Sequence, residues 1–218
     1  MPEISTVRPA QRVVPARFWL TSDFCAKLAR GVIMPDMPLK PVPLLRPQPT
    51  EYASYYEKYV SLVPGTDVLG VLEAQQMLMT QLLAARSERE GNFRYATDKW
   101  TVKELVGHIT DTERIFAYRA LRISRADTTP MEGFEQDDYV KHGGFNDRTL
   151  ADLTDEFDQV RNATLALYQG LGGEAWARRG VANKNEVTVR ALAYIIAGHE
   201  LHHRRILEEK YLPAIPRA

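Results

Sequence analysis

Three of the five histidines in this 218-residue chain lie close together in the sequence GHELHH, at residues 198–203. If this segment is helical, His199 and His203 are about 40° apart around the axis and about 6 Å apart along it, so both imidazoles can bind one metal ion. His202 points roughly 80° away from their shared face. Burying two imidazoles costs desolvation free energy, which a shared cation would offset. The pair therefore predicts a metal site that needs a third ligand.

His108 is the candidate for that ligand, and a clear helix start precedes it. Thr101 and Glu104 form a capping box, in which each side chain binds the free backbone amide of the other residue. Apolar residues then recur at helical spacing and place His108 two turns into the helix, facing inward. Together with His199 and His203 it could form a three-histidine set with an open position for water or substrate.

Neighbouring polar residues could complete such a site. A histidine that binds a metal through one nitrogen needs a hydrogen-bond partner for the other, and Asp111, Thr112 and Glu200 are our candidates. Arg119 and Tyr194 fall within reach of the expected pocket by helical spacing. They could orient a substrate, although a structural role is the simpler expectation for both.

Two other metal chemistries match part of the histidine pattern. The segment from His199 to His203 fits the HExxH motif of zinc proteases, in which a glutamate, here Glu200, acts as general base. Those enzymes take their third ligand from further downstream, where this chain has no histidine. A di-iron bundle needs two Glu-x-x-His motifs, and this sequence supplies one. We favour neither alternative.

Four long segments have the apolar periodicity of helices, each expected to span 20 or more residues. They cover about residues 66–90, 101–126, 148–171 and 189–207. A shorter helix is expected at residues 51–60. We find no convincing strand and no internal repeat, so the sequence predicts an all-α fold, a four-helix bundle.

The connection between the second and third helices, residues 127–146, is too long for a simple turn between neighbouring helices. It should be a long crossover that closes one end of the bundle, using Phe134, Tyr139, His142 and Phe145. Residues 174–186 are expected to form another loop, with Trp176 packed inward.

The chain divides into three predicted regions. Residues 1–47 read as an N-terminal extension, poorly ordered and proline-rich, whose first 36 residues could be a transit-like tail or could precede the true start of the protein. Residues 48–212 form the bundle domain, and residues 213–218 a tail.

The amino-acid composition indicates which classes of binding partner and which cellular compartment to expect. Lys plus Arg and Asp plus Glu are both 28, so the neutral balance gives no reason to expect a nucleic acid or an acidic membrane surface as partner. No apolar run approaches the length of a membrane span. Cys25 is the one cysteine, which excludes an internal disulfide framework and fits the reducing cytoplasm.

The motifs around the histidines resemble those of the DinB-like superfamily, a group of metal-binding four-helix bundles. The matching segments are KWTVKE (99–104), GHITDTER (107–114), FEQDDY (134–139) and GHELHH (198–203). The resemblance covers roughly residues 48–212. It implies a single divalent metal, often nickel or zinc, held by His108, His199 and His203.

The resemblance also implies an activity. Characterised relatives include thiol S-transferases that join bacillithiol to electrophiles, and mycothiol-dependent isomerases, in which the metal deprotonates the thiol. We therefore expect a metal-dependent transferase or hydrolase for a small-molecule substrate, with metal-bound water or thiolate as the reactive species. It could use a low-molecular-weight thiol and form a homodimer. The alternative is a non-catalytic helical module, metal-free or metal-storing, that acts as a dimer.

Overall fold

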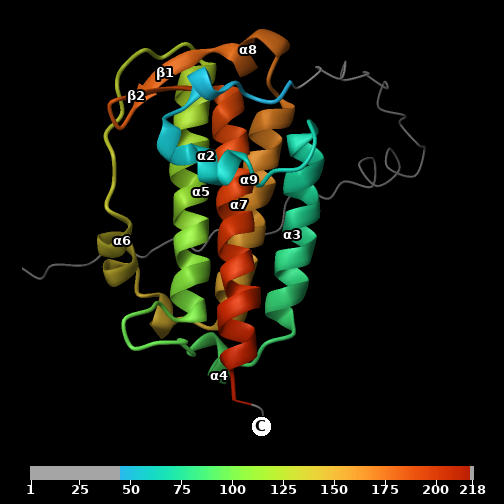
Figure 1. Cartoon of the computed structure of the whole chain (residues 1–218), viewed down its shortest axis with the longest axis vertical. Coiled ribbons are helices and arrows are strands. Elements are labelled where there is room, and N and C mark those ends of the chain that lie inside the picture. Colours follow the sequence, from blue (N-terminus) through green and yellow to red (C-terminus); the bar gives the residue numbers. More distant parts are fainter. Residues whose placement is uncertain (1–44, 217–218) are drawn as a thin grey trace, which may run out of the picture. The chain divides into compact units, whose positions relative to one another are not determined.

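Four long helices run side by side in the computed structural model, which describes residues 45–216 (Figure 1). They are α3 (Val68–Ala84), α5 (Val102–Ser124), α7 (Leu150–Gln169) and α9 (Val189–Ile206). The predicted four-helix bundle is confirmed. The expected helix length was right for α5 and α7, with 23 and 20 residues, and too long for α3 and α9, with 17 and 18.

Local sequence signals explain where these helices begin. The side chains of Asp67, Thr101, Thr149 and Thr188 each accept a backbone hydrogen bond from the first turn of the following helix. Thr101 also forms the predicted capping box with Glu104. The first helix ends at Ala84 and not just before Gly91, because a second capping box at Ser87 starts the separate helix α4 (Glu88–Gly91).

The chain direction accounts for the long crossover. Helices α5 and α7 run parallel, because the connection between them returns along the length of the bundle and carries helix α6 (Gln136–His142) on the way (Figure 1). Helices α3 and α9 run in the opposite direction. Both α3 and α5 pack against α7 and α9, so α3 and α5, which are consecutive in the chain, lie on opposite sides of that pair.

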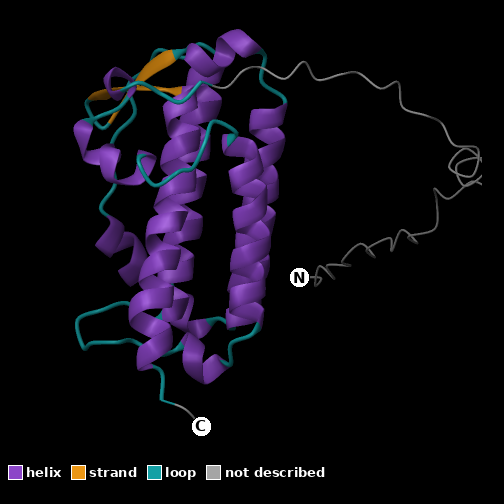
Figure 2. Cartoon of the chain, turned by 45° about the vertical axis from the view of Figure 1, so that its right-hand side comes forward, coloured by secondary structure: helices purple, strands orange, loops and turns teal. Residues whose placement is uncertain are grey.

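One end of the bundle is covered by short elements, and here the prediction of a structure without strands was wrong. Strands β1 (Arg179–Ala182) and β2 (Asn185–Thr188) form an antiparallel hairpin after helix α8 (Gly173–Ala177), where a loop was expected (Figure 2). Trp176 in α8 is buried, as predicted. The expected helix at residues 51–60 is shorter in the structure, where a 3-10 turn leads into α2 (Glu57–Val60).

A buried polar cluster joins all four helices, and we call Gln75, Glu113 and Arg161 the four-helix network. Arg161 donates from Nε and Nη2 to the two carboxylate oxygens of Glu113, both at 2.8 Å, and from Nη1 to the carbonyl oxygen of Leu72 at 2.8 Å. Gln75 donates to the carbonyl oxygen of Ala197 at 2.8 Å. Arg161 is fully buried, so this network fixes the helices relative to one another inside an apolar core.

The structure covers the predicted bundle domain and parts of the two terminal regions. Most of the predicted N-terminal extension, residues 1–47, and the last two residues of the predicted tail, 213–218, lie outside the described residues. Helix α9 continues into one π-helical turn, Leu207–Tyr211. Among residues 45–216, none of the helices combines the length and apolar character that crossing a membrane requires.

Candidate metal centre

His108 on α5 and the two histidines on α9 meet inside the bundle, because these helices pack against each other in opposite directions. Nε2 of His199 lies 3.1 Å from Nε2 of His108 and 3.1 Å from Nε2 of His203. All three side chains are buried, with exposed fractions of 3%, 5% and 9% for His108, His199 and His203. The structure thus brings together the three predicted ligands, and we call them the histidine cluster.

Hydrogen bonding alone cannot satisfy the histidine cluster. A neutral imidazole nitrogen either carries a proton or offers one lone pair, so Nε2 of His199 can bond to only one of its two neighbours at a time. Burial lowers the pKa of His108 to about 4, and burial together with the neighbouring histidines lowers the pKa of His203 to about 2. The rings are therefore neutral at pH 7. Three neutral imidazoles with converging Nε2 atoms are a donor set that fits one divalent cation.

The Nδ1 atoms of the histidine cluster have few hydrogen-bond partners. Thr112 Oγ1 lies 3.5 Å from Nδ1 of His108, one turn along α5. Nδ1 of His203 has no hydrogen-bond partner within the described part of the chain. Asp111, another candidate partner, forms an ion pair with Arg114 at 3.3 Å and no hydrogen bond to the three histidines. Thr112 is thus the candidate that reaches a cluster nitrogen.

Glu200, the third candidate, is buried but faces a different group. Its carboxylate lies 3.2 Å from Nε of Arg204. Burial raises the pKa of Glu200 to about 7, although Arg161 and Arg204 nearby oppose the shift. The carboxylate contacts none of the three histidines, so the HExxH arrangement of a glutamate beside the metal is not what the fold builds here.

A glycine sets how closely α2 approaches the cluster. A Cβ atom at Gly198 would overlap with the backbone carbonyl of Tyr59, so only glycine allows this contact between α2 and α9. The approach places the Tyr59 ring edge-on to His199, with centroids 5.3 Å apart, and 5.4 Å from the His202 ring. The tyrosines at residues 52–59 were expected to be lid or packing residues, but the contact of Tyr59 with Gly198 was not predicted, since neither residue type indicates a contact between distant segments.

Two cavities reach the histidine cluster. The larger, of about 390 Å³, is lined by His108 and His199, and its other walls come from α2, α5, the crossover and the hairpin turn. The smaller, of about 320 Å³, reaches His203 beside Trp100 and Tyr211. Asp137 on α6 lines both. The cluster is therefore accessible from two sides.

Of the other residues that the sequence analysis singled out, some line the larger cavity and others are buried in the core. Arg119 lines the larger cavity. Tyr194 does not: it is buried in the core, and its hydroxyl donates to the carbonyl oxygen of Thr66 at 3.2 Å. From the crossover, Phe134 lines the cavity, while Phe145 is buried in the bundle core.

Comparison with known families agrees with this arrangement. The family model of the DinB superfamily matches residues 71–207, more than half of the chain. The chain belongs to the DinB superfamily. The matched residues include His108, His199 and His203, so the whole histidine cluster of this DinB-superfamily protein lies inside the family region.

One solved structure and the curated proteins complete the comparison. YfiT from Bacillus subtilis, reported as "a probable metal-dependent hydrolase with an unusual four-helix bundle topology", aligns with a TM-score of 0.60 over 76% of this chain and 90% of that chain. The two sequences are 15% identical, so the likeness shows the fold. None of the curated proteins matches this DinB-superfamily sequence significantly.

Proposed function

We propose that this chain is a metal-dependent enzyme that holds one divalent ion through His108, His199 and His203. The observation that carries the proposal is the convergence of three buried Nε2 atoms, two pairs of them 3.1 Å apart, at a cavity of about 390 Å³. The fold of YfiT, a probable metal-dependent hydrolase, supports the same class for this chain.

The chain's own groups define what such a site would do. A divalent ion on three imidazoles supplies Lewis acidity, which polarises an oxygen or lowers the pKa of a water or a thiol. His108 keeps its Nε2 lone pair free if its Nδ1 proton is donated to Thr112, which fixes the required tautomer. Imidazole ligands suit nickel and zinc alike, and we propose one of these as the ion.

Hydrolysis of a small molecule is the first reaction we propose. The cavity beside His108 and His199 has a volume at the lower end of the range for small-ligand sites. Its lining combines aromatic residues, among them Tyr59, Phe116 and Phe134, with polar ones, which suits an organic substrate that carries polar groups.

Transfer of a low-molecular-weight thiol to an electrophile is the second candidate. The observation that favours it is the second cavity, which reaches His203 from another side of the cluster. Two cavities would allow a thiol and an electrophile to reach the reacting centre separately, which a reaction of two substrates can use. Both reactions use the same three histidines.

Metal analysis of the purified protein is the decisive experiment. We expect about one divalent ion per chain, lost in His108→Ala and retained in His142→Ala, because His142 lies exposed on α6. A metal-free protein whose melting temperature is unchanged by chelator or added ion would contradict the proposal. That result would favour the non-catalytic helical module instead.

Assays with and without the ion then separate the two reactions. Hydrolysis of ester and amide substrates, without thiol dependence, would identify the hydrolase. Metal-dependent conjugation of a thiol to an electrophilic fluorophore would identify the transferase. His108→Ala should abolish whichever activity is found. The expected homodimer, the cytoplasmic location and the absence of nucleic-acid and membrane partners stay predictions, and light scattering on the purified protein tests the first.

A further inference from the structure

Arg119 occupies an unusual position in the larger cavity. It follows His108 by eleven residues on α5, three helical turns, and therefore lies on the same side of that helix. Both residues line the cavity, yet the Arg119 side chain is only 4% exposed. A buried guanidinium thus shares a cavity with the histidine cluster.

The charge of Arg119 has no counter-ion in the described part of the chain. Nη2 donates to the backbone carbonyl of Glu132 at 2.7 Å, and no carboxylate of residues 45–216 forms an ion pair with the guanidinium. Arg161, the other deeply buried arginine, instead forms a bidentate pair with Glu113. The hydroxyl of Tyr56 also lies beside the Arg119 guanidinium, as a neutral partner. Because burying a cation without a counter-ion is costly, Arg119 is suited to an anion that arrives with a ligand.

The Arg119 side chain extends over the ring of Phe116. Its guanidinium carbon lies 5.5 Å from the centre of the Phe116 ring, which is one turn closer to His108. This orientation agrees with the tilt of helical side chains toward the helix N-terminus. The two residues are separated by a rise of about 16 Å along the helix axis, which sets the scale of the distance between the two ends of the cavity.

Part of the cavity lining is aromatic. Tyr55, Tyr56, Phe116 and Phe134 all line the cavity, and the Tyr56 and Phe116 rings meet edge to face with centroids 6.0 Å apart. Such a surface binds a flat or apolar molecular body.

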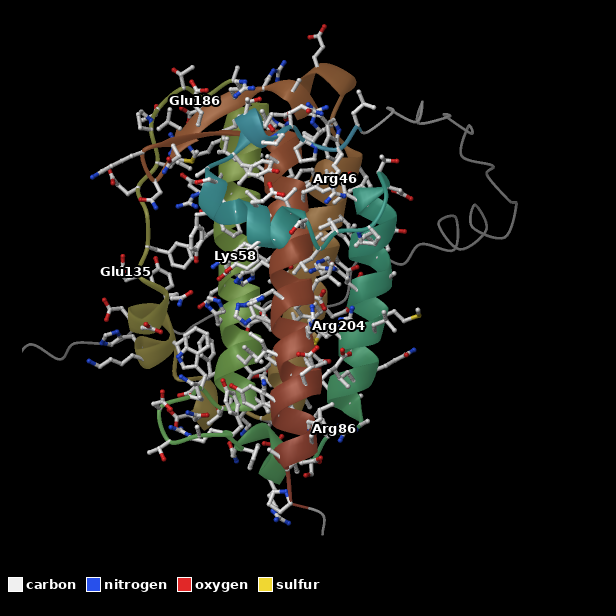
Figure 3. The ribbon with its side chains drawn as sticks, in the orientation of Figure 1. Arg46, Lys58, Arg86, Glu135, Glu186 and Arg204 are labelled. Carbon is white, nitrogen blue, oxygen red and sulfur yellow. The ribbon has the colours of Figure 1, made fainter. Side chains whose placement is uncertain are left out.

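Negative groups of the cavity lie at its mouth. Glu135 and Asp137 line the cavity and are exposed. Figure 3 shows Glu135 on the crossover and Lys58 on α2. Exposed charges are screened by water and salt, whereas the buried Arg119 is screened far less. The potential deep in the cavity is therefore set mainly by the arginine.

We propose that Arg119 binds the carboxylate of the substrate, a small organic acid with an aromatic or apolar body whose far end reaches the histidine cluster. The planar guanidinium can donate two parallel hydrogen bonds to a carboxylate. This inference rests on the proposed function for what happens at the histidine end, while carboxylate binding itself requires only the cavity.

The proposal is tested by calorimetric titration of metal-free and of metal-loaded protein. The ligands are benzoate, phenylacetate and cinnamate, and the affinity of each is compared with that of its primary amide. We expect the carboxylates to bind about tenfold or more tightly than the amides. Arg119→Met should remove that preference and leave amide binding unchanged. Arg119→Lys should keep part of it, since the charge remains and the fork is lost. Arg122→Met is the matched control, because Arg122 lies on the same helix and pairs with Asp127 outside the cavity.

Equal binding of acids and amides by the wild-type protein would overturn the proposal, as would failure of every carboxylate to bind. Unchanged acid binding by Arg119→Met would do the same, and if that variant does not fold, an Arg119→Lys variant indistinguishable from wild type would count equally against it. Carboxylate binding that depends on Arg119 in a protein that takes up no metal would sink the proposed function and leave this assignment intact.

Discussion

The interior of the bundle holds two clusters of buried polar side chains, and they differ in how their hydrogen-bonding groups are used. In the four-helix network, Arg161 finds acceptors for Nε, Nη1 and Nη2 within its own chain. In the histidine cluster, Nε2 of His199 can bond to only one of its two neighbouring Nε2 atoms, and Nδ1 of His203 has no partner among residues 45–216. The first arrangement is complete without a ligand, and the second calls for one.

The four-helix network and the histidine cluster also differ in their access to cavities. The four-helix network is enclosed by α3, α5, α7 and α9, whereas two cavities reach the histidine cluster. Polar groups that satisfy one another stabilise a fold, and polar groups held apart from partners beside a cavity stabilise a complex. The same helix, α5, contributes Glu113 to one cluster and His108 to the other.

The largest expected effect comes from breaking the four-helix network. Glu113→Gln leaves the Arg161 guanidinium buried without a counter-charge, so we expect the free energy of unfolding to fall by about 3 kcal/mol or more. Urea unfolding at pH 7 measures this. Replacing both partners, Glu113→Leu with Arg161→Met, should recover much of the loss. A single substitution that costs less than about 1 kcal/mol would remove the contrast between the clusters.

Metal binding should give the next largest effect, at the other cluster. An ion present at 100 times its Kd stabilises the folded protein by about 2.7 kcal/mol, seen as a higher melting temperature that chelator reverses. His203→Leu should abolish this response. In metal-free protein the same variant should unfold within about 1 kcal/mol of wild type, because it removes a buried nitrogen that has no partner. A loss comparable to that of Glu113→Gln would make the cluster structural.

A smaller effect is expected where α2 meets the histidine cluster. Gly198→Ala forces Tyr59 away from α9, and overpacking of this kind costs about 1–3 kcal/mol. Gly172→Ala is the matched control, since a Cβ atom there meets no atom within 4 Å. Thermal unfolding of both variants should separate them. Equal melting temperatures would mean that α2 adapts to the extra methyl group at no cost.

The smallest effect concerns the second nitrogen of His108. Thr112→Val removes the hydroxyl that lies 3.5 Å from Nδ1 and should weaken metal binding about tenfold with little change in stability. Thr164→Val makes the same change at a buried threonine on α7 whose hydroxyl has no partner in the described structure, and it should leave metal affinity unchanged. Competition titration with a chromophoric chelator measures both. Identical affinities would show that Thr112 does not orient the ring.

The helices and the histidine cluster could be predicted from the sequence because their signals are local. The capping box at Thr101 fixes the phase of α5, and helical spacing then places His108 on the inner face. The pair on α9 shares one face for the same reason. The length of the connection after α5 was enough to predict a long crossover. The expectation that it closes one end of the bundle was wrong, because it runs along the length of the bundle and the hairpin with α8 covers the end.

Other features depend on contacts between distant segments and left no such signal. The hairpin has strands of four residues, too short for alternation to stand out, and its turn places Asn183 and Lys184 at positive φ values of 48° and 62° without the glycine that usually marks such turns. The pairing of Glu113 with Arg161 could not be predicted from the sequence either, because on a helix each residue alone resembles a solvated surface charge.

The crossover between α5 and α7 supplies part of the cavity wall but none of the three histidines. The histidines project from helices locked into the core, while Phe134, Glu135 and Asp137 reach the cavity from a connection that runs outside the bundle. Connections of this kind tolerate insertions and substitutions far better than packed helices do. Evolution can therefore reshape the crossover to admit a new substrate while the reactive centre and the folding core stay unchanged.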